Sequence, residues 1–145
     1  MTVLMHGVAL VFLLIATLQD LKKREVLDWL NYGLFSYAVL YRLGASVVSN
    51  DYNILFDGFL GFLFALSVSA LFFYTGQWGG GDAKLLMALG TLLGWSYYLL
   101  AFTVSIFVMG TLFGLLFTFY LAIKNKKKFA YEFLNLHKKY KTMGY

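Results

Sequence analysis

One stretch of about 40 residues, from 84 to 123, contains Lys84 as its one charged side chain. A helix rises about 1.5 Å per residue, so an apolar run of about 20 residues crosses the hydrocarbon core of a bilayer. The stretch is therefore long enough for two crossings, and we place the break between residues 94 and 98. Composition agrees, since 61% of the residues are hydrophobic and 13% are charged, against about 25% charged residues in soluble domains. We expect an integral membrane protein.

Further apolar runs precede this stretch, at residues 2–20, 29–49 and 54–75. With the two later crossings they predict an all-α fold, a polytopic membrane helical bundle of about five transmembrane helices, with six as the alternative. The sequence contains no proline. Close helix packing is therefore expected at glycines, in the patterns Gly90-x-x-x-Gly94 and Gly110-x-x-x-Gly114.

The basic residues predict how these helices are oriented. They follow the first, third and fifth helices: Lys22, Lys23 and Arg24; Lys84; and Lys124, Lys126, Lys127, Lys128, Lys138, Lys139 and Lys141. Five crossings place all of them on one side, which the positive-inside rule identifies as the cytoplasm. Four crossings would divide them between the two sides. Arg42, inside the second helix, is the exception.

This topology predicts a multi-pass protein of the cell membrane with its N-terminus outside. Residues 1–123 would form the transmembrane core. Residues 124–145 would form a basic cytoplasmic tail, suited to a short amphipathic helix on the inner membrane surface. The net charge of +5 then reports orientation rather than nucleic-acid binding.

Most of the seven acidic residues have structural explanations. Asp28 is placed to cap the N-terminus of the second helix, and Asp57 suits the dipole at the start of the third. Asp51 lies in an outer loop, and Glu25 and Glu132 lie among basic residues in solvated segments. The sequence has no cysteine, which excludes disulfides and thiolate metal sites.

Asp20 and Asp82 are harder to explain in this way. Asp20 ends the first helix, where the helix dipole disfavours a carboxylate; the alternative is an interfacial acid balanced by the basic residues that follow. Asp82 comes after Gly79, Gly80 and Gly81, and it could simply cap the fourth helix behind a glycine turn. Three glycines nevertheless indicate a backbone that closely approaches another group or adopts a shape that no side chain allows.

The predicted topology puts Asp20 and Asp82 at the same depth on the cytoplasmic side. If the first and fourth helices pack together, the two carboxyls can face each other and hold one proton between them. Such a pair can activate a water while it protonates a carbonyl oxygen or a leaving amine. This is the chemistry of peptide hydrolysis without a covalent intermediate.

These motifs resemble those of the type IV prepilin and preflagellin peptidases, membrane aspartyl proteases of the GxGD type. Gly79-Gly80-Gly81-Asp82 matches the GxGD motif. "TLQDLKKREVLDWLNY" resembles the family's other catalytic segment, in which an aspartate precedes a basic loop and a short apolar motif. The resemblance covers roughly residues 8 to 123. It departs from the family at Leu27, where proline is common, and in the number of helices, which is commonly six.

The resemblance implies an aspartic endopeptidase that removes the leader of a prepilin-like or preflagellin protein at the cytoplasmic membrane edge. Asp20 and Asp82 would be catalytic, and no metal or cofactor would be needed. Gly79, Gly80 and Gly81 would let the loop move or let the substrate backbone approach, with simple turn geometry as the alternative. Nothing here resembles the cysteine-containing insert of the larger bacterial enzymes, which implies a minimal peptidase-only form without N-methyltransferase activity.

Two other functions remain open on the sequence. One is a GxGD intramembrane protease of the presenilin or signal-peptide-peptidase type, although Gln19 precedes Asp20 where those proteins have tyrosine. The other is a small transport or assembly subunit, in which Asp20 and Asp82 would bind or relay ions. Cleavage of a candidate leader distinguishes the peptidase from the ion-relay subunit.

Overall fold

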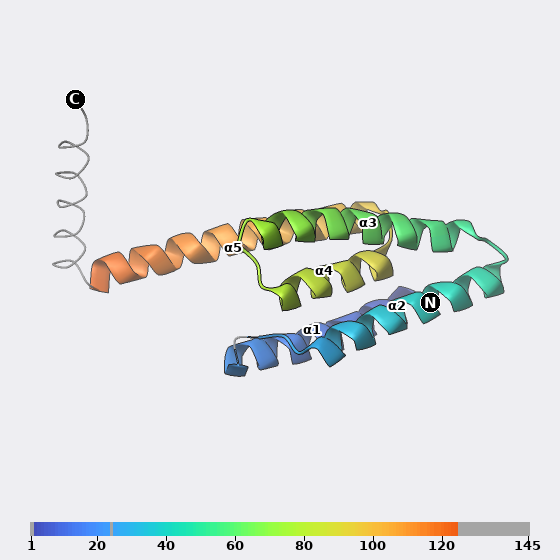
Figure 1. Ribbon diagram of the computed structural model, residues 1–145, viewed down its shortest axis with the longest axis horizontal. Coiled ribbons are helices and arrows are strands. Elements are labelled where there is room, and N and C mark those ends of the chain that lie inside the picture. The colour runs from blue at the N-terminus through green and yellow to red at the C-terminus, as the bar shows by residue number, and fades with distance from the viewer. Residues whose placement is uncertain (1, 24, 125–145) are drawn as a thin grey trace, which may run out of the picture. The chain divides into compact units, whose positions relative to one another are not determined.

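The computed structural model of the protein describes residues 2–23 and 25–124 (Figure 1). These residues form five α-helices and no strand: α1 (Thr2–Lys23), α2 (Asp28–Ser49), α3 (Asn53–Tyr74), α4 (Gly80–Leu93) and α5 (Tyr97–Lys124). The predicted all-α class is confirmed, and the predicted break between the last two helices is present. The predicted tail helix lies outside the described residues, apart from Lys124.

Three of these helices have the length and apolar character to cross a membrane: Met5–Lys23 of α1, Asn53–Tyr74 of α3, and Tyr97–Lys124 of α5. The fourth helix is much shorter. Its 14 residues rise about 21 Å, less than the hydrocarbon thickness of about 30 Å. The structure thus supports a helical membrane protein, while five crossings and an outside N-terminus stay predictions.

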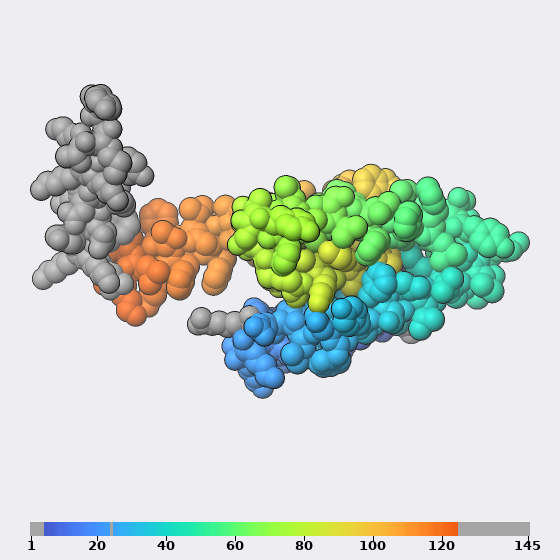
Figure 2. All heavy atoms as spheres, in the orientation of Figure 1, coloured from blue at the N-terminus to red at the C-terminus, as the bar shows by residue number. Residues whose placement is uncertain are grey.

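The chain divides into two compact units, Met1–Ala101 and Phe102–Tyr145. In the first unit, α4 packs against both α2 and α3, and α1 packs against α2 (Figure 1). Figure 2 shows the atoms of α4 filling the space between those of α2 and α3. Of the second unit, the structure describes residues 102–124, the greater part of α5.

Close packing of α3 on α4 depends on glycine. A side chain at Gly90 would overlap Ala65 and would come within 2.6 Å of the carbonyl oxygen of Gly61. A side chain at Gly61 would in turn overlap the backbone of α4. The predicted role of Gly90 in close helix contact is therefore confirmed. The pair Gly110 and Gly114 lies in the second unit, where its role stays a prediction.

Arg42 supports the far end of α4. It is buried, and its Nε and Nη2 donate to the carbonyl oxygens of Thr91 and Leu92, at 2.6 and 3.0 Å. Its Nη1 donates to the carbonyl oxygen of Ile54, at 2.5 Å. The last carbonyl groups of a helix have no hydrogen-bond donors within the helix, and here Arg42 is the donor for two of them. This explains why a basic residue occurs inside the second apolar run, away from the other basic residues.

Candidate functional site

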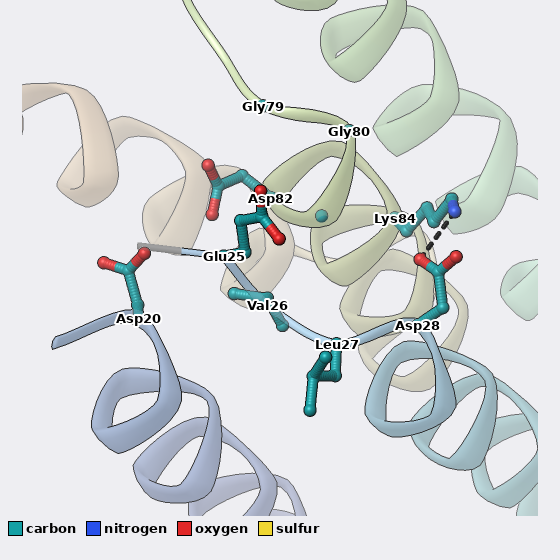
Figure 3. Close-up of a pocket in the computed structure, with 10 residues that line it drawn as sticks. Asp20, Glu25, Val26, Leu27, Asp28, Gly79, Gly80, Asp82 and Lys84 are labelled. Carbon is teal, nitrogen blue, oxygen red and sulfur yellow. Dashed lines mark hydrogen bonds and ion pairs between the residues drawn. The ribbon is translucent and has the colours of Figure 1, made fainter. Parts of the chain in front are cut away.

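A cavity of about 650 Å³ opens where α1 ends and α4 begins (Figure 3). Its lining comes from four segments: Asp20 of α1; Glu25, Val26 and Leu27 of the connection; Asp28 of α2; and Gly79, Gly80, Gly81, Asp82 and Lys84 at the start of α4. The structure therefore brings all five sequence-predicted site residues to one cavity. In Figure 3 the carboxyls of Asp20, Glu25 and Asp82 gather on one side of it, while Asp28 and Lys84 lie on the other.

Asp20 reaches the cavity from the last turns of α1. The helix continues to Lys23, so the prediction that it ends at Asp20 is wrong by three residues. The main neighbour of α1 is α2 rather than α4. The connection between α1 and α2 is held to α1 by Gln19, whose Oε1 accepts a hydrogen bond from the backbone N–H of Leu27 at 3.4 Å. The connection therefore lies between α1 and the start of α4 and brings Asp20 to the same cavity as α4.

Asp82 reaches the cavity from the first turn of α4. Gly79 is the N-cap residue of this helix, so the simple explanation of Asp82 as the N-cap is wrong. Asp82 is the third helical residue, and its carboxyl lies beside the glycine run, where the backbone of Gly79 favours its charged form.

Of the three glycines before Asp82, Gly81 is the one that the packing requires. A side chain there would come within 2.9 Å of the carbonyl oxygen of Val26 and 3.2 Å of its Cβ. At Gly79 and Gly80 a side chain would make ordinary contacts, and none of the three has a positive φ. The expected close approach is therefore between Gly81 and the α1–α2 connection. The alternative, a backbone conformation that only glycine adopts, does not occur at these three residues.

Asn31 of α2 also holds the glycine run, a role that the sequence analysis missed. Its side chain is 2% exposed, and its Nδ2 donates to the carbonyl oxygen of Gly81 at 3.1 Å. Its Oδ1 is buried and has no hydrogen-bond partner within residues 2–23 and 25–124. The available signal was a polar side chain in an apolar helix, three residues after Asp28 and thus on the same helix face.

Lys84 pairs with Asp28 on the side of the cavity away from the other carboxyls. Lys84 Nζ lies 2.6 Å from Asp28 Oδ1 and 5.5 Å from the centre of the Tyr32 ring. The predicted N-cap role of Asp28 is wrong, because the N-cap of α2 is Leu27 and Asp28 is its first residue. The lysine therefore neutralises Asp28 and joins the starts of α2 and α4. Among the described residues, it makes no ion pair with Asp82.

The pKa of Asp82 is raised above its ordinary value. Partial burial of its carboxyl in the cavity is the main cause, and the negative charge of Asp20 adds to it. The backbone of Gly79 acts in the opposite direction. The residue as a whole keeps an exposed surface, so the carboxyl is reachable from solvent. Two carboxyls that share a cavity in this way can hold a proton on one and a charge on the other, as general acid–base chemistry requires.

Glu25 is a third carboxyl in the cavity, although the sequence analysis placed it among solvated residues. It projects toward the start of α4 in Figure 3. In the part of the chain that the structure describes, neither it nor Asp20 forms an ion pair. The same residues include no group of three or more acidic, histidine or cysteine side chains arranged to hold a metal ion. The cavity therefore presents an excess of negative charge.

Comparison with known proteins bears on this arrangement. The model of the type IV leader peptidase family matches residues 7–122. A preflagellin peptidase of Methanococcus maripaludis is 36% identical over 80 residues, which are 55% of this chain and 34% of the relative. The preflagellin peptidase of Methanocaldococcus jannaschii is 35% identical over 81 residues, 56% of this chain and 34% of the relative.

A third preflagellin peptidase, from Methanococcus voltae, is 30% identical over 88 residues, 61% of this chain and 37% of the relative. The matches thus span about a third of the length of these curated relatives. No solved structure matches the chain. The family match covers most of the sequence, including both aspartates and the glycine run, and the chain belongs to the type IV leader peptidase family.

Proposed function

We propose that the protein is a membrane aspartyl endopeptidase that cleaves the leader of a type IV prepilin-like or preflagellin protein. The family and the names of the relatives support a leader peptidase. The observation that carries the aspartyl assignment is that Asp20 and Asp82, 62 residues apart in sequence, line one cavity. The substrate would be held with its scissile bond in this cavity.

Because burial and the nearby charge of Asp20 favour the protonated form of Asp82, we assign Asp82 as the proton donor and Asp20 as the base. Asp20 takes a proton from a water molecule, whose oxygen attacks the carbonyl carbon of the scissile bond. Asp82 donates its proton to the carbonyl oxygen, which gives a tetrahedral intermediate. When the C–N bond breaks, Asp20 passes the proton that it took from the water to the nitrogen, which leaves as the new N-terminal amine. Asp82 takes a proton back from a hydroxyl of the intermediate, so the carbonyl of the leader's new carboxyl group re-forms and the dyad returns to its starting state.

The lysine pattern supports a site at the cytoplasmic edge of the cell membrane, in a protein with five crossings and its N-terminus outside. The three carboxyls of Asp20, Glu25 and Asp82 in the cavity favour a cationic segment beside the scissile bond. We propose peptidase activity without N-methylation. The cleaved product then carries a free amine at its new N-terminus, which mass spectrometry of the product measures.

Cleavage of a preflagellin or prepilin by the purified full chain in liposomes tests this function. Asp20→Asn and Asp82→Asn are each expected to lower kcat/KM by a factor of about 100 to 10,000, as loss of a general acid or base does. Asp51→Asn is the matched control, because it makes the same change at a carboxyl between α2 and α3 that does not line this cavity. If both asparagine variants cleave at the wild-type rate, the dyad is wrong. If the wild type cleaves no leader but changes ion flux, the ion-relay function replaces it.

A further inference from the structure

Two polar side chains are buried where α4 begins between α2 and α3. Asn31 of α2 is 2% exposed, and Ser69 of α3 is fully buried. Asn31 Nδ2 donates to the carbonyl oxygen of Gly81 at 3.1 Å. Ser69 Oγ donates to the carbonyl oxygen of Ala83 at 3.0 Å. The two acceptors are the residues on either side of Asp82, so each neighbouring helix donates one hydrogen bond to the backbone that flanks this aspartate.

The two hydrogen bonds reach α4 from nearly opposite sides. Successive residues of an α-helix are about 100° apart around its axis, so Gly81 and Ala83 are about 200° apart. This agrees with the packing of α4 against both α2 and α3 (Figure 2). Asp82 lies between the two acceptors on the helix circumference, and it lines the cavity that it shares with Asp20 (Figure 3). A turn that is bonded on two sides resists rotation about its axis, and such a rotation would swing this carboxyl away from Asp20.

The backbone of α4 does not need these two bonds to satisfy its carbonyl groups. Carbonyls at the start of a helix already accept N–H groups of the next turn, and those that lack partners are the last four. A helical serine does not need a partner on another helix either. Ser67, two residues before Ser69, donates to the carbonyl oxygen of Leu63 in its own helix at 2.8 Å. The bond that Ser69 makes to Ala83 therefore serves to fix α3 to the first turn of α4.

Asn31 is likewise a poor choice for stability alone. Its Oδ1 is buried and has no hydrogen-bond partner among the described residues. An unpaired buried acceptor costs at least as much as one ordinary hydrogen bond contributes. Leu30 and Leu34 of the same helix are buried as completely and carry no such cost. What the amide of Asn31 adds is a fixed position for Gly81.

We propose that Asn31 and Ser69 are positioning residues, which hold the first turn of α4 so that the carboxyl of Asp82 faces the cavity. Neither side chain is among those that line the cavity, and both act through the backbone on either side of Asp82. A general acid must lie within hydrogen-bond reach of the atom that it protonates. This inference rests on the proposed function, in which Asp82 is the proton donor. Loss of either hydrogen bond should therefore lower kcat and leave KM nearly unchanged.

Cleavage kinetics of the full chain in liposomes test this role. Ser69→Ala removes one oxygen atom, and Asn31→Leu removes the amide donor at similar size. Each is expected to lower kcat about tenfold and to leave KM within about twofold of wild type, since a misplacement of about 1 Å can cost about 100-fold in rate. Ser67→Ala is the matched control on the same helix, because Ser67 is exposed and bonds within α3. It should change neither constant.

The Asp82→Ala background separates positioning from a general loss of folded protein. Because a positioning residue acts through the Asp82 carboxyl, Ser69→Ala and Asn31→Leu should lower the remaining single-turnover rate of this variant by less than about twofold. A general structural loss would instead lower that rate by the same factor as in wild type. That result, or a wild-type kcat in both single variants, overturns the positioning role.

A distance measurement gives a second readout that needs no peptidase activity. The sequence has no cysteine, so Asp82→Cys and Val48→Cys provide defined sites for two nitroxide spin labels. Val48 lies near the other end of α2 and is 76% exposed. The distribution of distances between the labels, measured by pulsed electron paramagnetic resonance, should broaden with Ser69→Ala or Asn31→Leu but not with Ser67→Ala.

The outcomes separate the two proposals. If the distance distribution stays as narrow in Ser69→Ala and Asn31→Leu as in the Ser67→Ala control, the positioning role is overturned and the peptidase function stands. If the wild type cleaves no leader, the proposed function fails. A broadened distribution would then still show that the two side chains hold the first turn of α4, but not that they serve catalysis.

Discussion

Replacement of Arg42 by leucine tests how the short helix α4 is held in place. The guanidinium donates hydrogen bonds to the carbonyl oxygens of Thr91, Leu92 and Ile54. Two of these oxygens belong to the last turn of α4, which ends at Leu93. Arg42→Leu leaves all three without their charged donor. The side chain is about the right size to fill much of the space, so the lost hydrogen bonds dominate the expected effect.

The magnitude follows from these three bonds. A hydrogen bond from a charged donor contributes about 1.5–3 kcal/mol, and an unpaired buried acceptor costs about 1–3 kcal/mol. The bonds share one donor group and are not additive, so we expect a total loss of about 3–5 kcal/mol in the free energy of unfolding. For a chain of this size that corresponds to a fall in Tm on the order of 10 °C. Arg42→Lys should lie between leucine and wild type, since an ammonium lacks the planar fork of arginine.

The assay is reversible unfolding of the purified protein in mixed micelles, followed by tryptophan fluorescence and circular dichroism. Leu40→Ala is the control, because Leu40 lies on the same helix and is 68% exposed; it should change the free energy of unfolding by less than about 1 kcal/mol. If Arg42→Leu were as stable as the control variant, the reasoning that Arg42 supports the end of α4 would be refuted.

Three further predictions concern the start and the packing of α4. The raised pKa of Asp82 means that the folded state binds a proton more tightly than the unfolded state. Protonation of Asp82 therefore stabilises the folded protein fully below the ordinary pKa of about 3.9, and this stabilisation is lost as the pH rises through the pKa of the folded state. Asp82→Asn should therefore be more stable than wild type at neutral pH, with the difference vanishing on acidification; the same gain in Asp51→Asn would contradict this cause. Gly90→Leu should cost about 3 kcal/mol or more, because the side chain has no room against α3, whereas Gly44→Leu, which points into open space, should cost less than about 1 kcal/mol in the same unfolding assay. Lys84→Met should leave the midpoint of chemical unfolding close to that of wild type, since its ion pair is exposed; a clear loss of stability would show that the pair is stronger than its exposure indicates.

Hydropathy alone predicted the helices well. The predicted runs 29–49 and 54–75 differ by one residue at their ends from α2 and α3. The predicted break between residues 94 and 98 contains Gly94, the C-cap of α4, where φ is +67°. These agreements have a simple cause, because a long apolar segment in a membrane must satisfy its backbone hydrogen bonds internally and so becomes a helix. Helix ends were less predictable, as the three extra residues of α1 show.

Sequence reasoning also singled out Asp20, Asp82 and the glycines between Trp78 and Asp82, because a carboxylate and three glycines are unusual in so apolar a chain. It could not assign partners. Asn31 and Gly81 are 50 residues apart, and Lys84 and Asp28 are 56 apart. Each such contact depends on how the helices are rotated and how far they slide along one another, which no local pattern encodes. The incorrect prediction that Asp82 and Asp28 are N-caps has the same cause. The local sequence indicates where a helix begins, but not which side chain of another helix lies beside it.

The sequence by itself determined that this is a helical membrane protein, where its helices lie, and which two aspartates lack an easy structural explanation. Only the tertiary structure decided that Glu25 joins those aspartates, that Gly81 is the position that must be glycine, and that Asn31 holds the glycine run. The physical reason is that helix formation depends on neighbouring residues along the chain. The cavity depends instead on which faces of α1, α2 and α4 meet, and on the few side chains that fill or leave open the space between them.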